Sequence, residues 1–378
     1  MIIMASEATF QKLLEEMVRR FTQNEVAPFD MEIDREGRLP KGLFQKLQDL
    51  GFLNAILPLD SDGAALNMTE AANLIKQLAY GNASVGVLLE GQYKTLYQLM
   101  KYGNDDIKER YLPKANHEIF AFGNTEPSGG SNPSGHQATA RQNGSNKWVI
   151  NGDKIMITNG TLAKNYIVVV KTDSDEFSCF LVDTQMPGVS FGQTENFIGL
   201  RGIPFGELVL DNVTVDESHL LGKRGQGLEI ANHAHDDARI LMGAVLTGIM
   251  EHIISVVKEY VQQRQAGQVL LKDLLLTHEK IAEIVTNKEL TRLAYTDAAR
   301  SKDERKTYTQ LSAITKSFGS RAAVKAGDMA LQLLGGYGYS YDYPIEHLIR
   351  DARAMEIAEG TVEKMFTEIT QAEFIKEV

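Results

Sequence analysis

The chain of 378 residues contains very little cysteine, with Cys179 as its single example. One thiol cannot form an internal disulfide or build a cysteine-rich metal site, so a reducing compartment is the natural environment. Positive charge is also in deficit, since 39 Lys and Arg stand against 50 Asp and Glu and give a formal net charge of −11. An acidic chain repels phosphate backbones, which argues against nucleic acid as a partner.

Long apolar runs and targeting signals are missing as well. No run of about 18 apolar residues occurs, so we expect no membrane-spanning segment. Residues 1–10 have no basic region and only a four-residue apolar run, which does not indicate a signal peptide. The composition, 43% hydrophobic and 24% charged, is that of an ordinary globular protein. We expect a cytoplasmic protein of two or three domains.

Several catalytic motifs are absent. The sequence has no GxxxxGK[ST], HExxH or GxSxG pattern, which excludes P-loop, zincin and hydrolase-elbow chemistry. The run Gly335-Gly336-Tyr337-Gly338 follows a helical stretch rather than a strand, so it is not a dinucleotide fingerprint. His233 and His235 are spaced i, i+2 and point to different helix faces, which argues against a zinc pair.

Residues 6–113 show helical periodicity. Apolar residues recur three and four positions apart in 10–21 and again in 43–50, the second stripe lying between Pro40 and Gly51, which are helix start and stop signals. We interpret both stripes as facing the core. Their members are Phe10, Leu13, Leu14, Met17, Val18 and Phe21, then Leu43, Phe44, Leu47 and Leu50.

The period drops to two between residues 120 and 221. Asn143-Gly144 predicts a hairpin between 137–142 and the run from Trp148 to Ile150. Further strands are expected at 166–170, 177–182, 208–210 and 213–215. Helices return after Gly227, with a stripe in 249–260 and a long helical segment from Leu311 to Gly335. The order of helices, strands and helices argues against alternating βαβ units.

Three segments are candidates for chemistry. Phe122 to Ser131 is a Pro-Gly-Gly loop between hydroxyl side chains, which is either an ordinary turn or a close approach of backbone N–H groups to an anion or flat ring. Lys154 to Gly160 is a strand that ends in a polar turn. Asp236 and Arg239 are spaced i, i+3 on a helix, and spacing alone predicts a solvated ion pair.

A fourth segment surrounds Glu359. Glu356, Glu359 and Glu363 share one helical face by spacing, which predicts a solvated acidic stripe. Gly360 argues against that interpretation, because a glycine inside a helix costs about 1 kcal/mol and usually marks a break. A carboxylate at such a break can face a ligand.

These segments together resemble the acyl-CoA dehydrogenase flavoprotein family over essentially the whole chain. The motifs FGNTEPSGGS, KIMITNG, GLRG, VLDNVTV, LLGKRGQG, HDDAR, LLGGYGY, RDAR and AEGT occur in the family's order and spacing. The resemblance implies an α+β multidomain fold with a helical N-terminal domain at 1–117, a middle β-barrel-like domain at 118–224 and a C-terminal four-helix bundle domain at 225–378. It also implies a homotetramer that uses FAD.

The implied reaction is α,β-dehydrogenation of an acyl-CoA to a trans-2-enoyl-CoA. A carboxylate removes the α-proton, flavin N5 takes the β-hydride, and an electron-transfer flavoprotein is the probable acceptor of the electrons. By resemblance Glu359 is the base. The other position used in some relatives is Ala238 here, which cannot serve. We expect burial against flavin and acyl chain to raise the pKa of Glu359 towards the working pH.

The resemblance also assigns binding residues, with FAD between the middle domain and the C-terminal helices. Matching FAD positions are Phe122, Asn124, Thr125, Gly130, Ser131, Met156, Thr158, Arg264, Gln332, Gly335, Gly336 and Thr361. Matching substrate positions are Ser131, Asp236 and Arg239 along the pantetheine arm, Glu90 in the distal acyl pocket, and Gly360 beside the base.

The chain departs from the family pattern at four places. Met156 replaces a usual aromatic residue, Asn132 a usual aspartate and His347 a common arginine. The segment 266–268 lacks the phenylalanine expected after Arg264, which puts the contact with FAD across subunits in question.

Two alternatives remain open from the sequence: a dehydrogenase of acyl groups bound to a carrier protein, and a flavin-free paralogue that kept the fold. The intact Glu359, Arg239 and Thr125 argue against the second. An oxidase is less favoured, because those chains are generally much longer.

Overall fold

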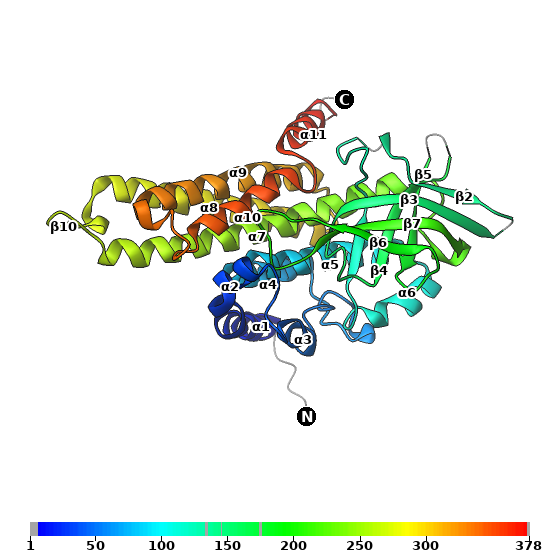
Figure 1. The fold of residues 1–378 in the computed structure, drawn as a ribbon, viewed down its shortest axis with the longest axis horizontal. Coiled ribbons are helices and arrows are strands. Elements are labelled where there is room, and N and C mark those ends of the chain that lie inside the picture. Colours follow the sequence, from blue (N-terminus) through cyan, green and yellow to red (C-terminus); the bar gives the residue numbers. More distant parts are fainter. Residues whose placement is uncertain (1–6, 133–134, 145, 174–175, 376–378) are drawn as a thin grey trace.

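The computed structural model describes residues 7–132, 135–144, 146–173 and 176–375, so residues 1–6 of the segment tested for a signal peptide lie outside it. Figure 1 shows the N-terminal helices in blue beneath a long helical bundle, with the sheet at one end. This confirms the predicted architecture of a helical N-terminal region, a middle sheet and a helical C-terminal region.

The N-terminal region is helical, as its periodicity predicted. Its helices are α1 (Glu7–Phe21), α2 (Asp30–Glu36), α3 (Leu43–Asp49), α4 (Met68–Gly81), α5 (Ala83–Tyr102) and α6 (Asp105–Tyr111). Asn67 caps α4 with a reciprocal bond to Glu70, and Asn82 caps α5. The helix α5 is buried along nearly its whole length, so it forms the inner layer against α7 and the sheet.

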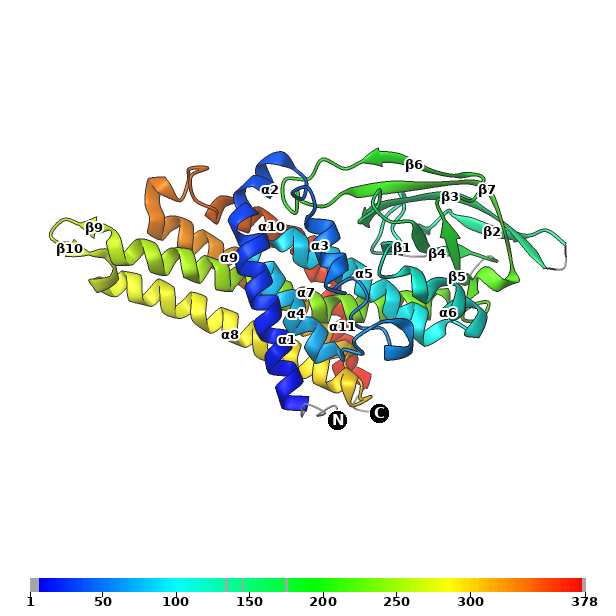
Figure 2. The ribbon, with the colours of Figure 1, turned by 90° about the horizontal axis from the view of Figure 1, so that it is seen from below.

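The apolar stripe of α1 is only partly buried. Val18 and Phe21 belong to the core, but Phe10, Leu13 and Met17 are 42%, 59% and 39% exposed. The prediction that the whole stripe faces the core is therefore wrong. The reason is that α1 lies on the outside of the N-terminal region, where its neighbours cover only part of its length (Figure 2).

The second stripe is largely confirmed. Leu43 and Leu47 of α3 are buried and Phe44 packs partly against the core. Leu50, which follows the helix, is 39% exposed.

The middle region is an eight-stranded mixed sheet in the order β6-β7-β3-β2-β4-β5-β8, with β1 paired in parallel to β4. Its strands are β1 (Phe120–Gly123), β2 (Thr139–Gln142), β3 (Lys147–Thr158), β4 (Asn165–Lys171), β5 (Phe177–Asp183), β6 (Val189–Thr194), β7 (Phe205–Asp216) and β8 (Leu220–Leu221). The hairpin predicted at Asn143-Gly144 is confirmed as the antiparallel pair β2–β3.

One strand replaces two that the sequence predicted. Residues 208–210 and 213–215 both belong to β7, which continues through Asn212. Asn212 has φ of 52°, a left-handed conformation that asparagine adopts more easily than most residues. The polar break between the two apolar runs therefore bends the strand without ending it.

The C-terminal region is a bundle of long helices. Its elements are α7 (Gly227–Gln263), the short hairpin β9 (Gln265–Ala266) and β10 (Val269–Leu270), α8 (Leu275–Asp303), α9 (Thr309–Leu334), α10 (Ile345–Ile357) and α11 (Val362–Ile375). The predicted stripe of α7 is buried at Ile249, Ile253 and Val257. Gly335 ends α9 as predicted, with φ of 59°.

The central helix α7 is long and apolar enough, by length and composition, to cross a membrane. However, 72% of its most apolar stretch is buried inside the protein, where it packs against α4, α5, α8 and α9. It is therefore the core helix of the bundle, and it brings residues 235–239 next to the sheet.

Candidate active site

Glu359 lies in a tight turn between α10 and α11. The helix α10 ends at Ile357 and α11 begins at Val362, so Gly360 marks a break, as predicted. Glu359 itself has φ of 55° and Gly360 has φ of 91°. The spacing argument that put Glu359 on a solvated helical face with its acidic neighbours is therefore wrong. A left-handed glutamate costs free energy, which is typical of residues held for function.

Two buried cations hold the backbone of this turn. Arg239 Nε donates to the carbonyl oxygen of Glu359 at 3.0 Å. Lys316 Nζ, on α9, donates to the carbonyl oxygens of Glu356, at 2.8 Å, and of Gly360. Burial lowers the pKa of Lys316 to about 8. The backbone of the strained turn is therefore held by Arg239 and Lys316, which do not bind the carboxylate of Glu359.

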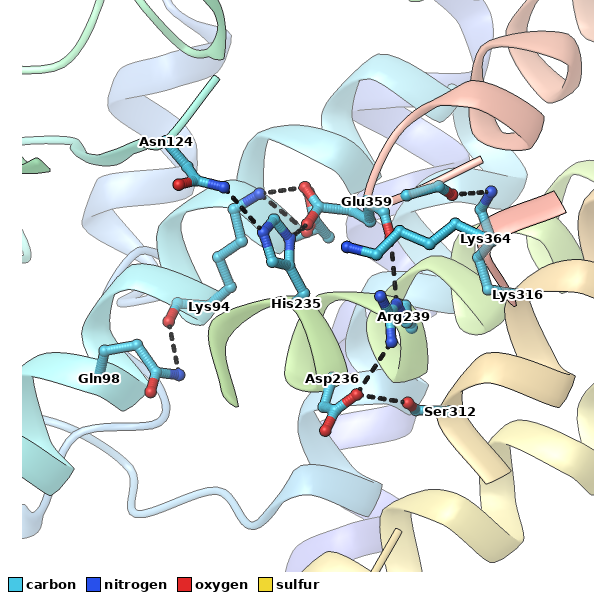
Figure 3. A network of polar contacts seen from close by, with 12 residues as sticks. Lys94, Gln98, Asn124, His235, Asp236, Arg239, Ser312, Lys316, Glu359 and Lys364 are labelled. Carbon is cyan, nitrogen blue, oxygen red and sulfur yellow. Dashed lines mark hydrogen bonds and ion pairs between the residues drawn. The ribbon is translucent and has the colours of Figure 1, made fainter. Parts of the chain in front are cut away.

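Side chains of two other helices bind the carboxylate of Glu359 (Figure 3). Lys94 Nζ, on α5, forms an ion pair with Oε1. His235 Nδ1, on α7, donates to Oε2 at 2.6 Å, and Asn124 Nδ2 donates to His235 Nε2 at 3.2 Å. The side chain of Glu359 is only 10% exposed, so the group is fixed and largely dry.

The electrostatics of Glu359 differ from the sequence-based expectation. Burial alone would raise its pKa, but the charge of Lys94 and the hydrogen bond from His235 outweigh burial and hold the pKa below the ordinary value of a glutamate. The expectation of a raised pKa concerns burial against flavin and acyl chain and did not include Lys94, and it stays a prediction. In the structure as it stands, Glu359 is ionised and weakly basic.

The wall of the site contributed by α5 is polar. Glu90, Lys94 and Gln98 are spaced i, i+4, i+8, and all three are buried. Glu90 Oε1 lies 3.8 Å from Lys94 Nζ and has no hydrogen-bond partner among the described residues. Burial raises the pKa of Glu90 to about 7. Gln98 Nε2 donates to Asp237 Oδ2 at 2.9 Å and ties this face of α5 to α7.

Asp236 and Arg239 are not a solvated pair, so the interpretation from spacing alone is wrong. They are 4% and 3% exposed, and Arg239 Nη1 donates to Asp236 Oδ1 at 3.1 Å and to Glu368 Oε2 at 2.6 Å. Asp236 also accepts from Thr309 and Ser312 at 2.7 and 2.9 Å. This network lies behind the turn of Glu359, and binding of the pantetheine arm by the pair stays a prediction.

Part of the predicted FAD group gathers beside Glu359. Gly91 lets α5 lie against the end of β3, because a Cβ there would come within 3.0 Å of Thr158 Cγ2. Asn124 Oδ1 is buried without a hydrogen-bond partner among the described residues. Met156 is 44% exposed and has φ of 57°. An exposed apolar side chain and an unsatisfied acceptor at one strand end suit a flat polar ring.

The remaining residues predicted near this end take varied positions. Phe122 is buried within β1, and Gly130 packs on Thr125, where a Cβ would come within 3.1 Å of Thr125 Cγ2. Ser131 is exposed in its loop. Thr361 Oγ1 accepts from the backbone N–H of Lys364 at 3.3 Å.

A second group of predicted residues lies at the other end of α7. Arg264, Gly335 and Gly336 line a hollow of about 660 Å³, and Gln332 is exposed on the last turn of α9. The Arg264 guanidinium lies 5.7 Å from the ring centroid of Tyr337. At 1.5 Å per residue this end is about 40 Å from the His235 end. The structure therefore divides the predicted cofactor residues between two separate places.

Sequence reasoning did not identify Lys94, His235 or Lys316 as site residues. The signal for Lys94 was a lone lysine in the otherwise uncharged stretch 91–100, which belongs to a buried helix. The signal for His235 was its position four residues before Arg239, on the same helix face. Nothing in the sequence around Lys316 shows that its ammonium reaches the turn 356–360.

Comparisons with known proteins agree with the geometry. Family models for the N-terminal, middle and C-terminal domains of acyl-CoA dehydrogenases match residues 9–118, 121–213 and 225–374. The chain is 34% identical over 366 residues to an acyl-CoA dehydrogenase of Bacillus subtilis (strain 168), covering 93% of this chain and 95% of that protein.

Solved structures are similar over nearly the whole chain. Butyryl-CoA dehydrogenase from Megasphaera elsdenii matches with a TM-score of 0.94 and 29% identity, covering 99% of this chain and 100% of that one. A glutaryl-CoA dehydrogenase from Mycobacterium smegmatis in complex with FADH2 matches with a TM-score of 0.90 and 28% identity, covering 96% and 94%. The resemblance seen in the sequence is confirmed, and the chain belongs to the acyl-CoA dehydrogenase family of oxidoreductases.

Proposed function

We propose that the protein binds FAD and dehydrogenates an acyl thioester between its α and β carbons. Glu359 takes the α-proton, the β-hydrogen leaves with its electron pair, and a trans double bond forms between the two carbons. FAD supplies the acceptor for that hydride. The observation that carries the proposal is the carboxylate of Glu359, held by a strained turn in a largely buried site where α5, α7 and the end of β1 meet.

The residues beside Glu359 suit a flavin. The unsatisfied Oδ1 of Asn124 would accept from a ring N–H group, and the exposed thioether of Met156 would cover one face of the ring. Thr125 and Thr158 add hydroxyl groups at the same strand ends. These four residues would hold the reactive end of the cofactor next to the base.

For Glu359 to act as a base, its contact with Lys94 must change when substrate binds. An ion pair that lowers the pKa of the carboxylate also lowers its basicity. Entry of the acyl group between α5 and the turn displaces the ammonium and excludes water, and both changes raise the pKa. His235 then keeps the carboxylate oriented through Oε2.

The second group of predicted residues, at Arg264 and Gly335, serves FAD of a neighbouring subunit in our proposal. This second group lies too far from Glu359 for both to contact the same end of a single FAD bound to one chain. Leu275 and Leu276 at the start of α8 are 82% and 71% exposed, as expected of residues covered by assembly. Sedimentation velocity tests the proposed homotetramer, and a stable monomer that retains FAD contradicts it.

The proposal covers thioesters of the pantetheine arm, which coenzyme A and acyl carrier proteins share. We also propose that an electron-transfer flavoprotein oxidises the reduced enzyme. Turnover that is faster with such a flavoprotein than with air alone supports this acceptor, and equal rates argue for an oxidase.

The decisive experiment replaces the base. In Glu359→Gln the amide keeps the shape of the side chain but cannot take a proton, so we expect flavin content to hold while flavin reduction slows by about 10²–10⁴-fold. The matched control is Glu363→Gln, an exposed glutamate four residues away, which should reduce flavin at the wild-type rate. A near wild-type rate in Glu359→Gln overturns the proposed function.

A further inference from the structure

On the α5 side of the candidate site, charged side chains stand where a saturated hydrocarbon chain would require an apolar lining. The α5 wall presents Glu90 and Lys94, which are 3% and 6% exposed, directly beside Glu359. An alkyl chain placed against them would bury both without giving either a hydrogen bond. Glu90 Oε1 already lacks such a partner among the described residues. This wall is built for a group that forms hydrogen bonds.

The position of that group follows from the contacts of Lys94. Its ammonium touches Oε1 of Glu359 and lies 3.8 Å from Oε1 of Glu90. Glu359 must reach the α-proton, so whatever meets Lys94 and Glu90 lies only a short way along the acyl chain, nearer to the reacting carbons than the distal position that the family resemblance gave Glu90. The polar group therefore belongs on a carbon close to the reacting pair.

The charges of the cluster select among polar groups. Glu90, Lys94 and Glu359 bring two carboxylates and one ammonium. A substrate carboxylate would add a further negative charge beside the base, and a substrate ammonium would compete with Lys94. A hydroxyl is neutral, donates one hydrogen bond and accepts others. A hydroxyl can therefore serve both partners without changing the charge.

We infer that the natural acyl group is short and carries a hydroxyl close to the reacting carbons, which donates to Glu90 and accepts from Lys94. This inference rests on the proposed function and specifies the class of acyl group that the enzyme uses. By taking the ammonium as its donor, the hydroxyl releases the carboxylate of Glu359 from Lys94. A hydrocarbon substrate offers Lys94 no acceptor, so displacing the ammonium from Glu359 leaves it without a hydrogen bond and costs free energy. Recognition of the acyl group and activation of the base are thus one event.

The test uses holoenzyme and pantetheine thioesters, because that arm is common to both carriers. The probes are butanoyl, 4-hydroxybutanoyl, 4-aminobutanoyl and succinyl pantetheine, and the readout is the rate of flavin bleaching without oxygen. We expect the kcat/KM for the hydroxyacyl thioester to exceed that for butanoyl by about 100-fold or more. A preference for the butanoyl, amino or carboxylate probe overturns the inference.

A double variant removes the recognition without altering net charge. Glu90→Leu combined with Lys94→Met replaces the ion pair by apolar side chains, a change that buried pairs often tolerate. We expect it to reverse the preference towards butanoyl. The control is Lys101→Met, an exposed lysine on the same helix, which should keep the wild-type preference. An unchanged preference in the double variant overturns the inference.

These experiments distinguish a failure of the inferred hydroxyl preference from a failure of the proposed dehydrogenation. If no thioester bleaches the flavin of the wild type, the proposed dehydrogenation itself is wrong. If butanoyl bleaches well and Glu359→Gln abolishes bleaching, the function stands and only the hydroxyl is refuted.

Discussion

The ammonium of Lys94 pairs with the carboxylate of Glu359, although 265 residues separate them in the chain. One belongs to a helix of the N-terminal region and the other to a turn near the C-terminus. The pair lowers the pKa of the proposed base through a side chain from another part of the molecule. Its consequences can be measured directly.

Removal of Lys94 should shift the pH dependence of flavin reduction. In Lys94→Met the carboxylate of Glu359 loses its main stabilising charge, so its pKa rises and the acid limb of kcat/KM for butanoyl pantetheine moves to higher pH. Glu90, His235, Arg239 and Lys316 also surround the base and are unchanged in this variant. Lys101→Met, which leaves the pair intact, should keep the wild-type limb. A limb at lower pH in Lys94→Met would show that Lys94 does not suppress the base.

Arg239 should act as a positioning residue. Arg239→Lys keeps the charge but cannot reproduce the fork that joins Glu359, Asp236 and Glu368. We expect kcat to fall by about tenfold or more, because a small displacement of a base is costly, while KM changes little. The matched control is Arg353→Lys, whose guanidinium is exposed and pairs with Glu356. A large rise in KM at constant kcat would instead place Arg239 on the pantetheine arm.

Lys316 should stabilise the turn rather than the chemistry. Lys316→Met removes the donor to two backbone carbonyl oxygens, so we expect the free energy of unfolding to fall by about 2 kcal/mol. Lys325→Met on the same helix removes an exposed ion pair with Glu283 and should cost less than about 1 kcal/mol. Urea denaturation of both variants measures the difference. Equal losses would mean that the turn does not depend on Lys316.

His347 should link stability to pH. It lies between Asp30, at 2.9 Å, and Asp351, at 3.5 Å, and these carboxylates overcome burial and raise its pKa to about 10. A raised pKa gives stability that is fully present below the ordinary value of 6.5 and is lost as pH rises through about 10. His252 also faces Asp30, and burial lowers its own pKa.

His347→Gln should therefore reduce the free energy of unfolding at pH 6 by about 3–5 kcal/mol, and by much less above pH 10. Replacement of the exposed His278 by glutamine should have no such pH-dependent effect. Denaturant unfolding across this range checks both variants. A loss that does not change with pH would show that His347 is neutral in the folded protein.

Local features of the fold were predictable from the sequence because their causes are local. Asn143-Gly144 favours a tight turn, Gly335 a helix end and Gly360 a break, and each has this effect in the structure. The exposed half of α1 was not predictable, since a periodic stripe shows which side of a helix is apolar but not how far its neighbours extend.

The site was predictable only in part. The motif match pointed to Glu359, and the glycine after it agreed on physical grounds. Lys94 and His235, which bind that carboxylate, are distant from Glu359 in the sequence. Spacing along one helix gives no information about contacts between distant segments. For the same reason Asp236 and Arg239 looked solvated, whereas α9 and α11 in fact cover them.

The division of the site between the two ends of the chain has an evolutionary consequence. The proposed proton-abstracting group and the lysine that pairs with it are encoded in distant parts of the gene, so recombination between relatives can exchange one without the other. From the proposed roles of Glu359 and the α5 side chains, we expect a chimera that inherited a different α5 to keep its reaction while its choice of acyl group changed. Selectivity can thus diversify by inheritance of the first domain alone.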